Sequence, residues 1–185
     1  KGTRMTGDNN GPAAIFLDRD GVINPLIIRE GQRTSPRSMS EWQIFPDVEP
    51  SLQRLRDAGY LLLVITNQPE IARKQSDPRI VNEFHQELLS KRMVNAIKMC
   101  PHDDADNCAC RKPRPGMIID HQKEMGVDLS RSFVIGDTWK DVNAGAAAGV
   151  RTILLRREYS GDAQPDYELS TLTEAVDLVL RGSRT

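Results

Sequence analysis

Five short apolar segments alternate along this chain with segments whose apolar residues recur at helical spacing. Continuous apolar runs of this length are typical of strands buried on both faces, and they cover residues 13–17, 60–65, 95–100, 132–136 and 151–155. The intervening segments that favour helices cover residues 48–59, 77–93, 115–126, 138–150 and 170–180. This alternation predicts an α/β fold in which a central parallel sheet lies between two layers of helices, a three-layer Rossmann-like arrangement.

Length and charge narrow the class of protein further. The chain of 185 residues is long enough for one domain with a substantial core, and its formal net charge of −1 offers no strong field for nucleic acid or an anionic membrane. The longest apolar run, residues 60–65, is too short to span a bilayer, and we recognise no secretory signal. We therefore expect a cytoplasmic, monomeric domain over residues 13–185, after a polar, disordered leader at residues 1–12.

Two aspartates, Asp18 and Asp20, follow the first apolar segment and precede Gly21. Alternate residues of an extended segment point the same way, so both carboxylates can face one point beyond the strand. Two negative charges this close are costly unless a cation or a shared proton relieves them, and Mg²⁺ accepts carboxylate oxygens. One aspartate could then attack phosphorus while the other transfers protons; a plain Asp-Gly turn is the alternative.

Polar residues follow two further apolar segments. Thr66, Asn67 and Gln68 end the second segment, where a hydroxyl and two amides can hydrogen-bond phosphoryl oxygens, although a polar cap on the next element is an alternative. Arg111 and Lys112 are adjacent cations held by the prolines at 113 and 115, and they suit a phosphate group. A solvated basic turn is the alternative for this pair.

A third aspartate, Asp137, follows the fourth apolar segment, and Asp141 lies one helical turn later on the same face. Asp137 could complete a Mg²⁺ site with Asp141 orienting it, or both could simply favour the positive end of the following helix. Ligands bind beyond the carboxyl ends of the strands in open α/β sheets. These motifs all lie at such ends, so the sequence predicts one shared site.

The three cysteines fall within eleven residues, together with one histidine. A closed tetrahedral set for structural Zn²⁺ is offered by Cys100, His102, Cys108 and Cys110. A disulfide is the alternative, but it would leave one cysteine unpaired and is rare in a cytoplasmic chain. Zinc would pin a loop that has no core of its own, together with the cations that follow it. The other histidines, His85 and His121, are expected to be ordinary surface residues of helices.

In their order at strand ends, the motifs FLDRDGVIN, TNQ, CRKPRPG and VIGDTWKDV resemble those of the haloacid dehalogenase (HAD) superfamily of aspartyl-phosphate phosphatases. The resemblance covers residues 13 to about 181. It implies Asp18 as the nucleophile and Asp20 as the general acid and base. It also implies Thr66 and Lys112 as phosphoryl stabilisers, and a Mg²⁺ site made by Asp18, Asp137 and the backbone carbonyl of Asp20.

The cysteine loop with CRKPRPGM, FLDRDGVIN, TNQ and IAR is similar to one branch of this superfamily, the D-glycero-D-manno-heptose-1,7-bisphosphate 7-phosphatases and histidinol-phosphate phosphatases. This resemblance implies Mg²⁺-dependent hydrolysis of a sugar bisphosphate, with Arg111 helping to bind it. The chain departs from the pattern at three places. Thr138 stands where the family usually has Lys, Pro69 and Glu70 alter the turn after TNQ, and the segment 25–47 is unusually long.

No insertion is large enough to form a separate cap domain, so loops must contact the substrate. Asn67 and Gln68 are candidates for such contacts. We also expect at least one of four loop arginines to meet a second anionic group: Arg29, Arg33, Arg37 or Arg73. The alternative is that these arginines only solvate a mobile loop.

Other functions compete with a heptose bisphosphatase. Histidinol phosphate or another sugar phosphate could be the substrate, whereas the near-neutral charge argues against a nucleic-acid 3′-phosphate. A receiver-like module that is phosphorylated on Asp18 without rapid turnover is a non-enzymatic alternative. Asp20 argues against that alternative, because a phosphate-storing module needs no acid or base two residues after its nucleophile.

Overall fold

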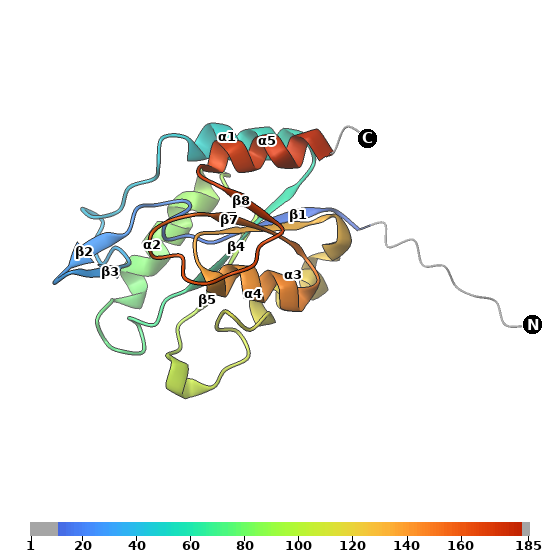
Figure 1. Ribbon diagram of the computed structural model, residues 1–185. Helices are drawn as coiled ribbons and strands as arrows, with labels where there is room; N and C mark the ends of the chain where they lie inside the picture. Colours follow the sequence, from blue (N-terminus) through green and yellow to red (C-terminus); the bar gives the residue numbers. More distant parts are fainter. Residues whose placement is uncertain (1–10, 183–185) are drawn as a thin grey trace, which may run out of the picture.

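The computed structural model describes residues 11–182 and contains one six-stranded parallel sheet (Figure 1). Its strands, in spatial order, are β5 (Ala96–Cys100), β4 (Leu61–Asn67), β1 (Ala14–Leu17), β6 (Phe133–Gly136), β7 (Arg151–Leu155) and β8 (Tyr167–Leu169). Every neighbouring pair is parallel. The predicted central parallel sheet is thus confirmed.

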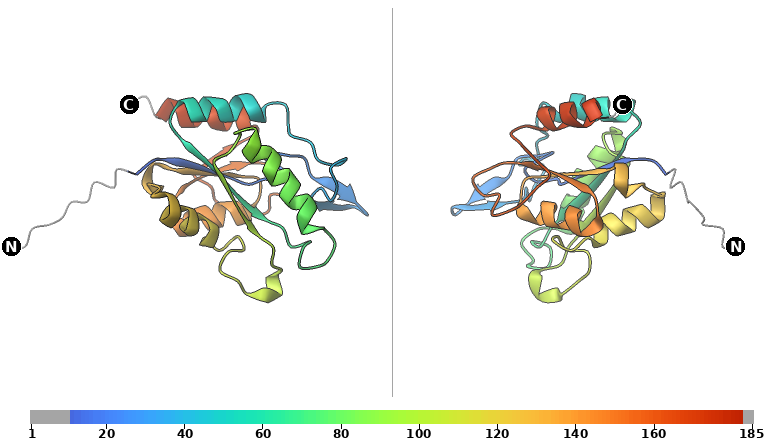
Figure 2. Two further views of the ribbon diagram at one scale, coloured as in Figure 1. Left: turned by 180° about the vertical axis from the view of Figure 1, so that it is seen from behind. Right: turned by 45° about the vertical axis from the view of Figure 1, so that its right-hand side comes forward.

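Helices cover both faces of the sheet (Figure 2). The helices α1 (Val48–Asp57), α2 (Pro78–Ser90) and α5 (Leu172–Gly182) pack on one face, and α3 (Gly116–Met125) and α4 (Trp139–Ala148) pack on the other. Alternate residues of β1 serve the two layers: Ile15 and Leu17 face the first, and Ala14 and Phe16 face the second. Full burial on both faces explains why the strands are continuously apolar.

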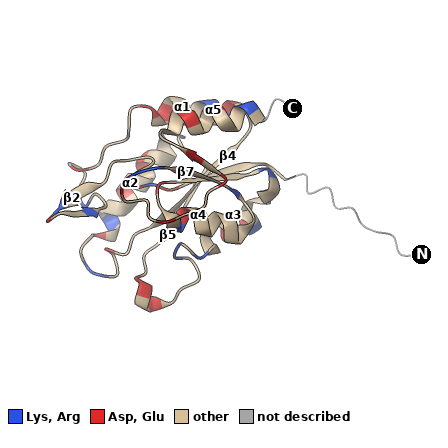
Figure 3. Ribbon diagram, viewed as in Figure 1, with Lys and Arg blue, Asp and Glu red and all other residues tan. Residues whose placement is uncertain are grey.

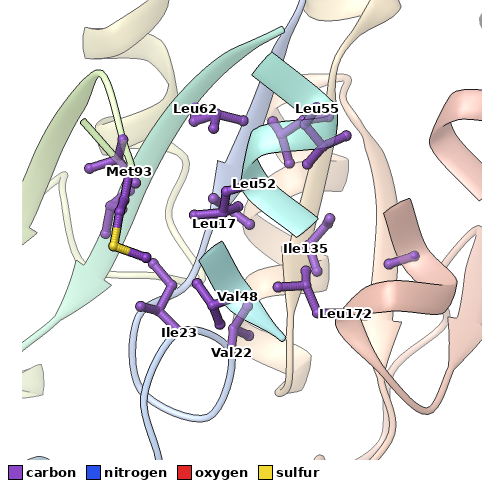
Figure 4. Close-up of a cluster of buried hydrophobic side chains, with 14 of the residues drawn as sticks. Leu17, Val22, Ile23, Val48, Leu52, Leu55, Leu62, Met93, Ile135 and Leu172 are labelled. Atoms are coloured by element: carbon purple, nitrogen blue, oxygen red, sulfur yellow. The ribbon is translucent and has the colours of Figure 1, made fainter. Parts of the chain in front are cut away.

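The larger core lies between the sheet and the helices α1, α2 and α5. Figure 4 shows part of it, with Leu17 of β1 and Ile135 of β6 close to Leu52 and Leu55 of α1 and to Leu172 of α5. All five side chains are buried. This packing fixes β1 next to β6, and these two strands end at the site described below.

Three short strands were not predicted. The strands β2 (Ile27–Arg29) and β3 (Gln32–Thr34) form an antiparallel hairpin inside the predicted excursion 25–47, with Gly31 in the left-handed region at its turn. The edge strand β8 is only three residues long and mostly exposed, so it carries no apolar signal. The hairpin is too small for a cap domain, in agreement with the prediction.

Side-chain hydrogen bonds cap the starts of two helices. The Asp77 side chain accepts a hydrogen bond from the backbone of Arg79 at the start of α2, and the Thr171 hydroxyl accepts one from Glu174 at the start of α5. Two single-turn helices, η1 (Asp104–Asp106) and η2 (Leu129–Arg131), lie in loops. Among the described residues, no helix is long and apolar enough to cross a membrane.

The chain enters the sheet at Pro12, whose carbonyl accepts a hydrogen bond from the backbone of Asp128 (3.0 Å). Residues 1–10 of the predicted leader lie outside the described residues. The expectation of surface histidines is wrong, because His85 and His121 are both buried. Burial lowers the pKa of His85 to about 4. Both histidines lie on the inner faces of their helices, which the sequence periodicity did not reveal.

Candidate active site

The sheet order brings three predicted strand ends together at one edge. Asp18 follows β1, Thr66 ends β4 and Asp137 follows β6, and β1 lies between the other two strands. The backbone amide of Asp18 donates to the carbonyl of Ile135 (3.0 Å). This hydrogen bond extends the pairing of β1 and β6 to the first residue after β1. A pocket opens here, lined among others by Asp18, Asp20, Glu70, Lys112, Asp137 and Tyr159.

Three buried carboxylates, Asp18, Asp137 and Asp141, form what we call the acidic cluster. One oxygen from each lies within 4.8 Å of the other two. Burial, followed by the charge of Asp141, raises the pKa of Asp18 well above its ordinary value and that of Asp137 to about 7. Three buried carboxylates this close together are costly unless a cation offsets their negative charge. The residues fit a Mg²⁺ ion, because all the donors are carboxylate oxygens and the buried Oδ1 of Asp137 has no hydrogen-bond partner among the described residues.

Glycine is required at position 21 beside this cluster. Gly21 has a φ of +90°, and a Cβ there would clash with the carboxylate of Asp137. The glycine that follows the two aspartates therefore allows the loop after β1 to approach the end of β6.

Lys112 supplies the positive charge within the acidic cluster. Its buried Nζ donates hydrogen bonds to Oδ1 of Asp141 (2.6 Å), Oδ1 of Asp18 (2.9 Å) and the carbonyl of Ile65 (2.8 Å). Burial alone would lower the pKa of Lys112, but the two aspartates outweigh burial and raise it above its ordinary value. The lysine is therefore held as a cation against the predicted nucleophile.

The carboxylate of Asp20 lies outside the acidic cluster, which corrects the expectation that it faces the same point as the carboxylate of Asp18. Its oxygens accept hydrogen bonds from four side chains: Gln68 (2.7 Å), Asn24 (2.8 Å), Ser35 (2.8 Å) and Arg19 (3.1 Å). Burial alone would raise the pKa of Asp20. The charge of Arg19 and these hydrogen bonds lower it below its ordinary value.

Arg19 is a functional neighbour that sequence reasoning missed. It is fully buried, and its guanidinium lies 5.7 Å from the ring centre of Trp42 and 5.6 Å from that of Phe84. Its Nη1 lies 3.0 Å from Nε2 of the buried His85. Trp42 lies in a loop and Phe84 in α2, both distant from Arg19 in the sequence. The position of Arg19 between the two aspartates therefore did not reveal these contacts.

The three polar residues at the end of β4 act as supports for other site residues. The side-chain amide of Gln68 donates to Asp20 and to the hydroxyl of the buried Thr66 (2.9 Å). The amide group of Asn67 donates to the backbone carbonyl of Lys112 and accepts from its backbone N–H, both at 3.0 Å. Direct contacts of these three with substrate remain predictions, and Asn67 is the one that lines the pocket.

The predicted zinc ligands meet in the loop between β5 and α3, which we call the cysteine loop. The four ligand atoms of Cys100, His102, Cys108 and Cys110 lie within 4.8 Å of one another, with neighbouring separations of 3.4–3.6 Å. A tetrahedral zinc with Zn–S bonds near 2.3 Å separates two sulfur ligands by about 3.8 Å, and the shorter Zn–N bond brings a histidine ligand closer, so the set fits this ion. The three cysteines are free, and the disulfide alternative has no support.

Arg111 is tied to the cysteine loop. Its guanidinium donates to Asp104 of η1 (2.6 Å) and to the carbonyl of His102 (3.2 Å), and it also lines the pocket. Figure 3 shows the acidic residues gathered on η1. The loop therefore orients the cation that precedes Lys112.

The four loop arginines differ in whether an acidic side chain already pairs with their guanidinium group. Arg29 pairs with Glu41, and Arg73 makes a two-pronged contact with Asp103 (2.6 and 2.7 Å). Arg37 donates to the neutral side chain of Gln75. Arg33 lines the pocket and stacks 4.6 Å from the ring centre of Tyr159; its acidic neighbour, Glu158, lies 3.9 Å away and is 97% exposed. Contact with a second anion remains a prediction, and Arg33 is placed best for it.

Tyr159 and Thr138 hold the residues that follow β6. The Tyr159 hydroxyl donates to Oδ2 of Asp137 (2.7 Å), a contact that sequence reasoning missed. The backbone N–H and hydroxyl of Thr138 donate to Oδ2 of Asp141 (3.1 and 3.0 Å), so Thr138 begins α4 and orients Asp141. Lys140 also lines the pocket, two residues after the position where the family usually has Lys.

Comparisons with known proteins agree with this arrangement. The HAD-hydrolase-like family matches residues 109–177. The chain is similar to the D-glycero-beta-D-manno-heptose-1,7-bisphosphate 7-phosphatase of Rhodopseudomonas palustris, with 39% identity over 158 residues, 79% of this chain and 84% of the relative. The protein of the same name from Helicobacter pylori is 40% identical over 148 residues, 77% of this chain and 82% of the relative.

A solved structure is similar over nearly the whole length. It is the crystal structure of the D,D-heptose 1,7-bisphosphate phosphatase of B. bronchiseptica, complexed with magnesium and phosphate. Its TM-score is 0.78 at 31% identity, and the match covers 92% of this chain and 99% of that chain.

Proposed function

The chain belongs to the D-glycero-beta-D-manno-heptose-1,7-bisphosphate 7-phosphatase family of HAD-like hydrolases, and on this basis we propose that it removes the 7-phosphate from a heptose 1,7-bisphosphate. The observation that carries the proposal is the acidic cluster around Lys112, with the separately oriented Asp20 lining the same pocket. In this proposal Asp18 is the nucleophile, Lys112 the cation and Asp20 the acid-base group, and all three line one pocket.

Asp18 and Asp137 would hold a Mg²⁺ ion, with Asp141 beside them and the backbone carbonyl of Asp20 as a further expected ligand. When bound, the ion would offset the negative charge of the phosphoryl group during its transfer. The donor set and the unpartnered Oδ1 of Asp137 support this choice of metal.

Asp18 attacks phosphorus in the proposed reaction and forms an aspartyl phosphate as the sugar oxygen leaves. Lys112 and the backbone N–H of Arg19 both donate to Oδ1 of Asp18, at 2.9 and 2.8 Å, and so fix the orientation of its carboxylate. Lys112 also faces the negative charge that develops on the phosphoryl oxygens.

Asp20 gives a proton to the leaving oxygen and then removes one from the water that hydrolyses the aspartyl phosphate. Its lowered pKa supports the second role, because the free site holds it as a carboxylate. The first role requires Asp20 to take up a proton when the anionic substrate arrives, since a nearby negative charge raises the pKa of a carboxyl group.

The cysteine loop would bind a structural Zn²⁺. Its ligands leave no open position for chemistry, so its effect on the reaction runs through the residues it orients. Arg111 and Lys112 follow the last ligand, Cys110, directly. We infer that zinc fixes both cations relative to Asp18, and that Arg111 and Arg33 contact the parts of the substrate outside the reacting phosphate.

A panel of sugar phosphates tests the proposal. Release of inorganic phosphate is measured with Mg²⁺ and after its removal by a chelator, for heptose 1,7-bisphosphate, the corresponding monophosphates and histidinol phosphate. We expect the highest kcat/KM for the bisphosphate, with loss of the 7-phosphate. A higher kcat/KM for histidinol phosphate would mean that histidinol phosphate, and not the heptose bisphosphate, is the substrate. A single phosphorylation of Asp18 without turnover would contradict an enzymatic role.

A further inference from the structure

Glu70 places a carboxylate in the wall of the pocket at a position where the sequence departs from the family pattern. The residue is 8% exposed, and its Oε2 is buried without a hydrogen-bond partner among the described residues. The other oxygen, Oε1, has one long contact with the backbone N–H of Ser35 (3.5 Å). A buried carboxylate oxygen that lacks a donor costs free energy, so a donor is expected from a bound molecule.

The backbone holds Glu70 in this place. Its carbonyl accepts hydrogen bonds from the backbone N–H groups of Gln75 (2.8 Å) and Ser76 (3.2 Å), which closes the turn after Gln68. Arg73 lies near enough for the charge of Glu70 to raise its pKa, but the hydrogen bonds of Arg73 go to Asp103. These backbone contacts therefore fix the turn that carries Glu70 beside the pocket.

Ser35 connects Glu70 to the acid-base group. The Ser35 hydroxyl donates to Oδ2 of Asp20 (2.8 Å), while its backbone N–H contacts Glu70. The oxygen that leaves phosphorus must approach Asp20 to receive a proton. Ser35 and Glu70 line the pocket next to Asp20, so they border the region that the carbon atoms beside the leaving oxygen would occupy.

We propose that Glu70 determines substrate specificity by accepting, at Oε2, a hydrogen bond from a hydroxyl group of the leaving alcohol close to its phosphate ester. A carboxylate accepts hydrogen bonds from hydroxyls but repels a second phosphate, so this part of the wall selects polyol phosphates. The inference rests on the proposed phosphatase function and adds the class of leaving group that the site prefers.

A pair of small substrates isolates the hydroxyl. Glycerol 3-phosphate and propyl phosphate share a three-carbon chain, and only the first carries hydroxyls beside the ester. We expect wild-type protein to prefer glycerol 3-phosphate in kcat/KM, and Glu70→Ala to reduce that preference by about 10- to 100-fold, the range for a hydrogen bond to a charged group. The variant Glu70→Gln, which keeps an acceptor oxygen, should retain part of the preference.

Glu158→Ala is the matched control, because it removes an exposed carboxylate at the edge of the site. It should keep the preference, and the thermal midpoint of each variant shows whether it is folded. An equal loss on both substrates would mean that Glu70 only holds its turn, and an unchanged preference would also overturn the inference. Wild-type protein that does not hydrolyse heptose bisphosphate, but whose preference for glycerol 3-phosphate over propyl phosphate still depends on Glu70, would contradict the substrate assignment alone. The role of Glu70 would then stand.

Discussion

The acidic cluster and the cysteine loop lie at the same edge of the sheet, but their members come from very different distances along the sequence. Asp18 and Asp137 are 119 residues apart, and the pairing of β1 with β6 brings them together. The four ligands of the cysteine loop lie within eleven residues, and no residue of its η1 turn is buried. The fold builds the first cluster, whereas in the second the ligands themselves must hold the chain.

This difference predicts that substitutions in the two regions have different effects on activity and stability. The acidic cluster is supported by a packed sheet, so a substitution there should remove chemistry and spare the fold. The cysteine loop has no core of its own, so loss of its metal should loosen the loop first and affect chemistry indirectly. Lys112 joins the two regions, because it follows Cys110 by two residues and donates to Asp18 and Asp141.

Asp18→Asn should have the largest effect. We expect kcat to fall by at least about 10³-fold, because the amide cannot act as the nucleophile. The thermal midpoint should stay or rise, because the change removes one of three buried carboxylates that repel one another. Phosphate release and thermal unfolding are measured together, with Asp162→Asn as an exposed control. Retained turnover would contradict the view that the acidic cluster carries the chemistry.

Lys112→Met should come next, and it should damage both catalysis and stability. Loss of one positioned charge at a phosphoryl group is expected to cost about 10²- to 10³-fold in kcat. Removing one partner of a buried ion pair costs about 3–5 kcal/mol of the free energy of unfolding. Kinetics and urea unfolding check both values, with Lys98→Met, which breaks a surface pair with Glu124, as the control. Normal stability would show that the lysine is not held between the aspartates.

Cys110→Ser should lower kcat by about 10-fold, because a loosened loop positions Lys112 less well. Hydrogen exchange should increase mainly over residues 100–112 and leave β1 and β6 protected. Mass spectrometry of exchanged peptides tests this localisation. Uniform exchange over the sheet would contradict the view that the loop is separate from the core.

Arg33→Ala should have the smallest effect of the four. We expect KM for the bisphosphate to rise by about 10-fold with little change in kcat, because the arginine meets a group outside the reacting phosphate. Arg29→Ala is the control, since Arg29 already pairs with Glu41. Equal changes in both variants would mean that the hairpin, and not one free charge, shapes this side of the pocket.

The sequence predicted what depends on single strands and local spacing. Each aspartate motif follows an apolar segment, and the cysteine loop places its ligands by local spacing alone, so both clusters could be expected from linear patterns. Asp141 was expected only as a support, yet the structure puts it inside the acidic cluster. Its place depends on Thr138, which caps α4 and donates hydrogen bonds to the carboxylate of Asp141.

The parts that were not predicted depend on contacts between distant loops. The guanidinium of Arg19 pairs with Asp20, which lies outside the acidic cluster. Ser35 reaches the site from the loop after the β2–β3 hairpin, and Tyr159 from the loop after β7. Periodicity reports burial only for regular elements, so it could not place these side chains. The short strands β2, β3 and β8 also lack an apolar pattern.

Metal content measured together with activity tests most directly the claim that this chain has two metal sites with separate roles. We expect wild type to retain one zinc per chain after dialysis and to need added Mg²⁺ for turnover. Asp137→Asn should keep the zinc and lose Mg²⁺-dependent turnover, while Cys108→Ser should lose the zinc and keep slower, Mg²⁺-dependent turnover. Full activity of Asp137→Asn, or wild-type protein without zinc, would contradict the account.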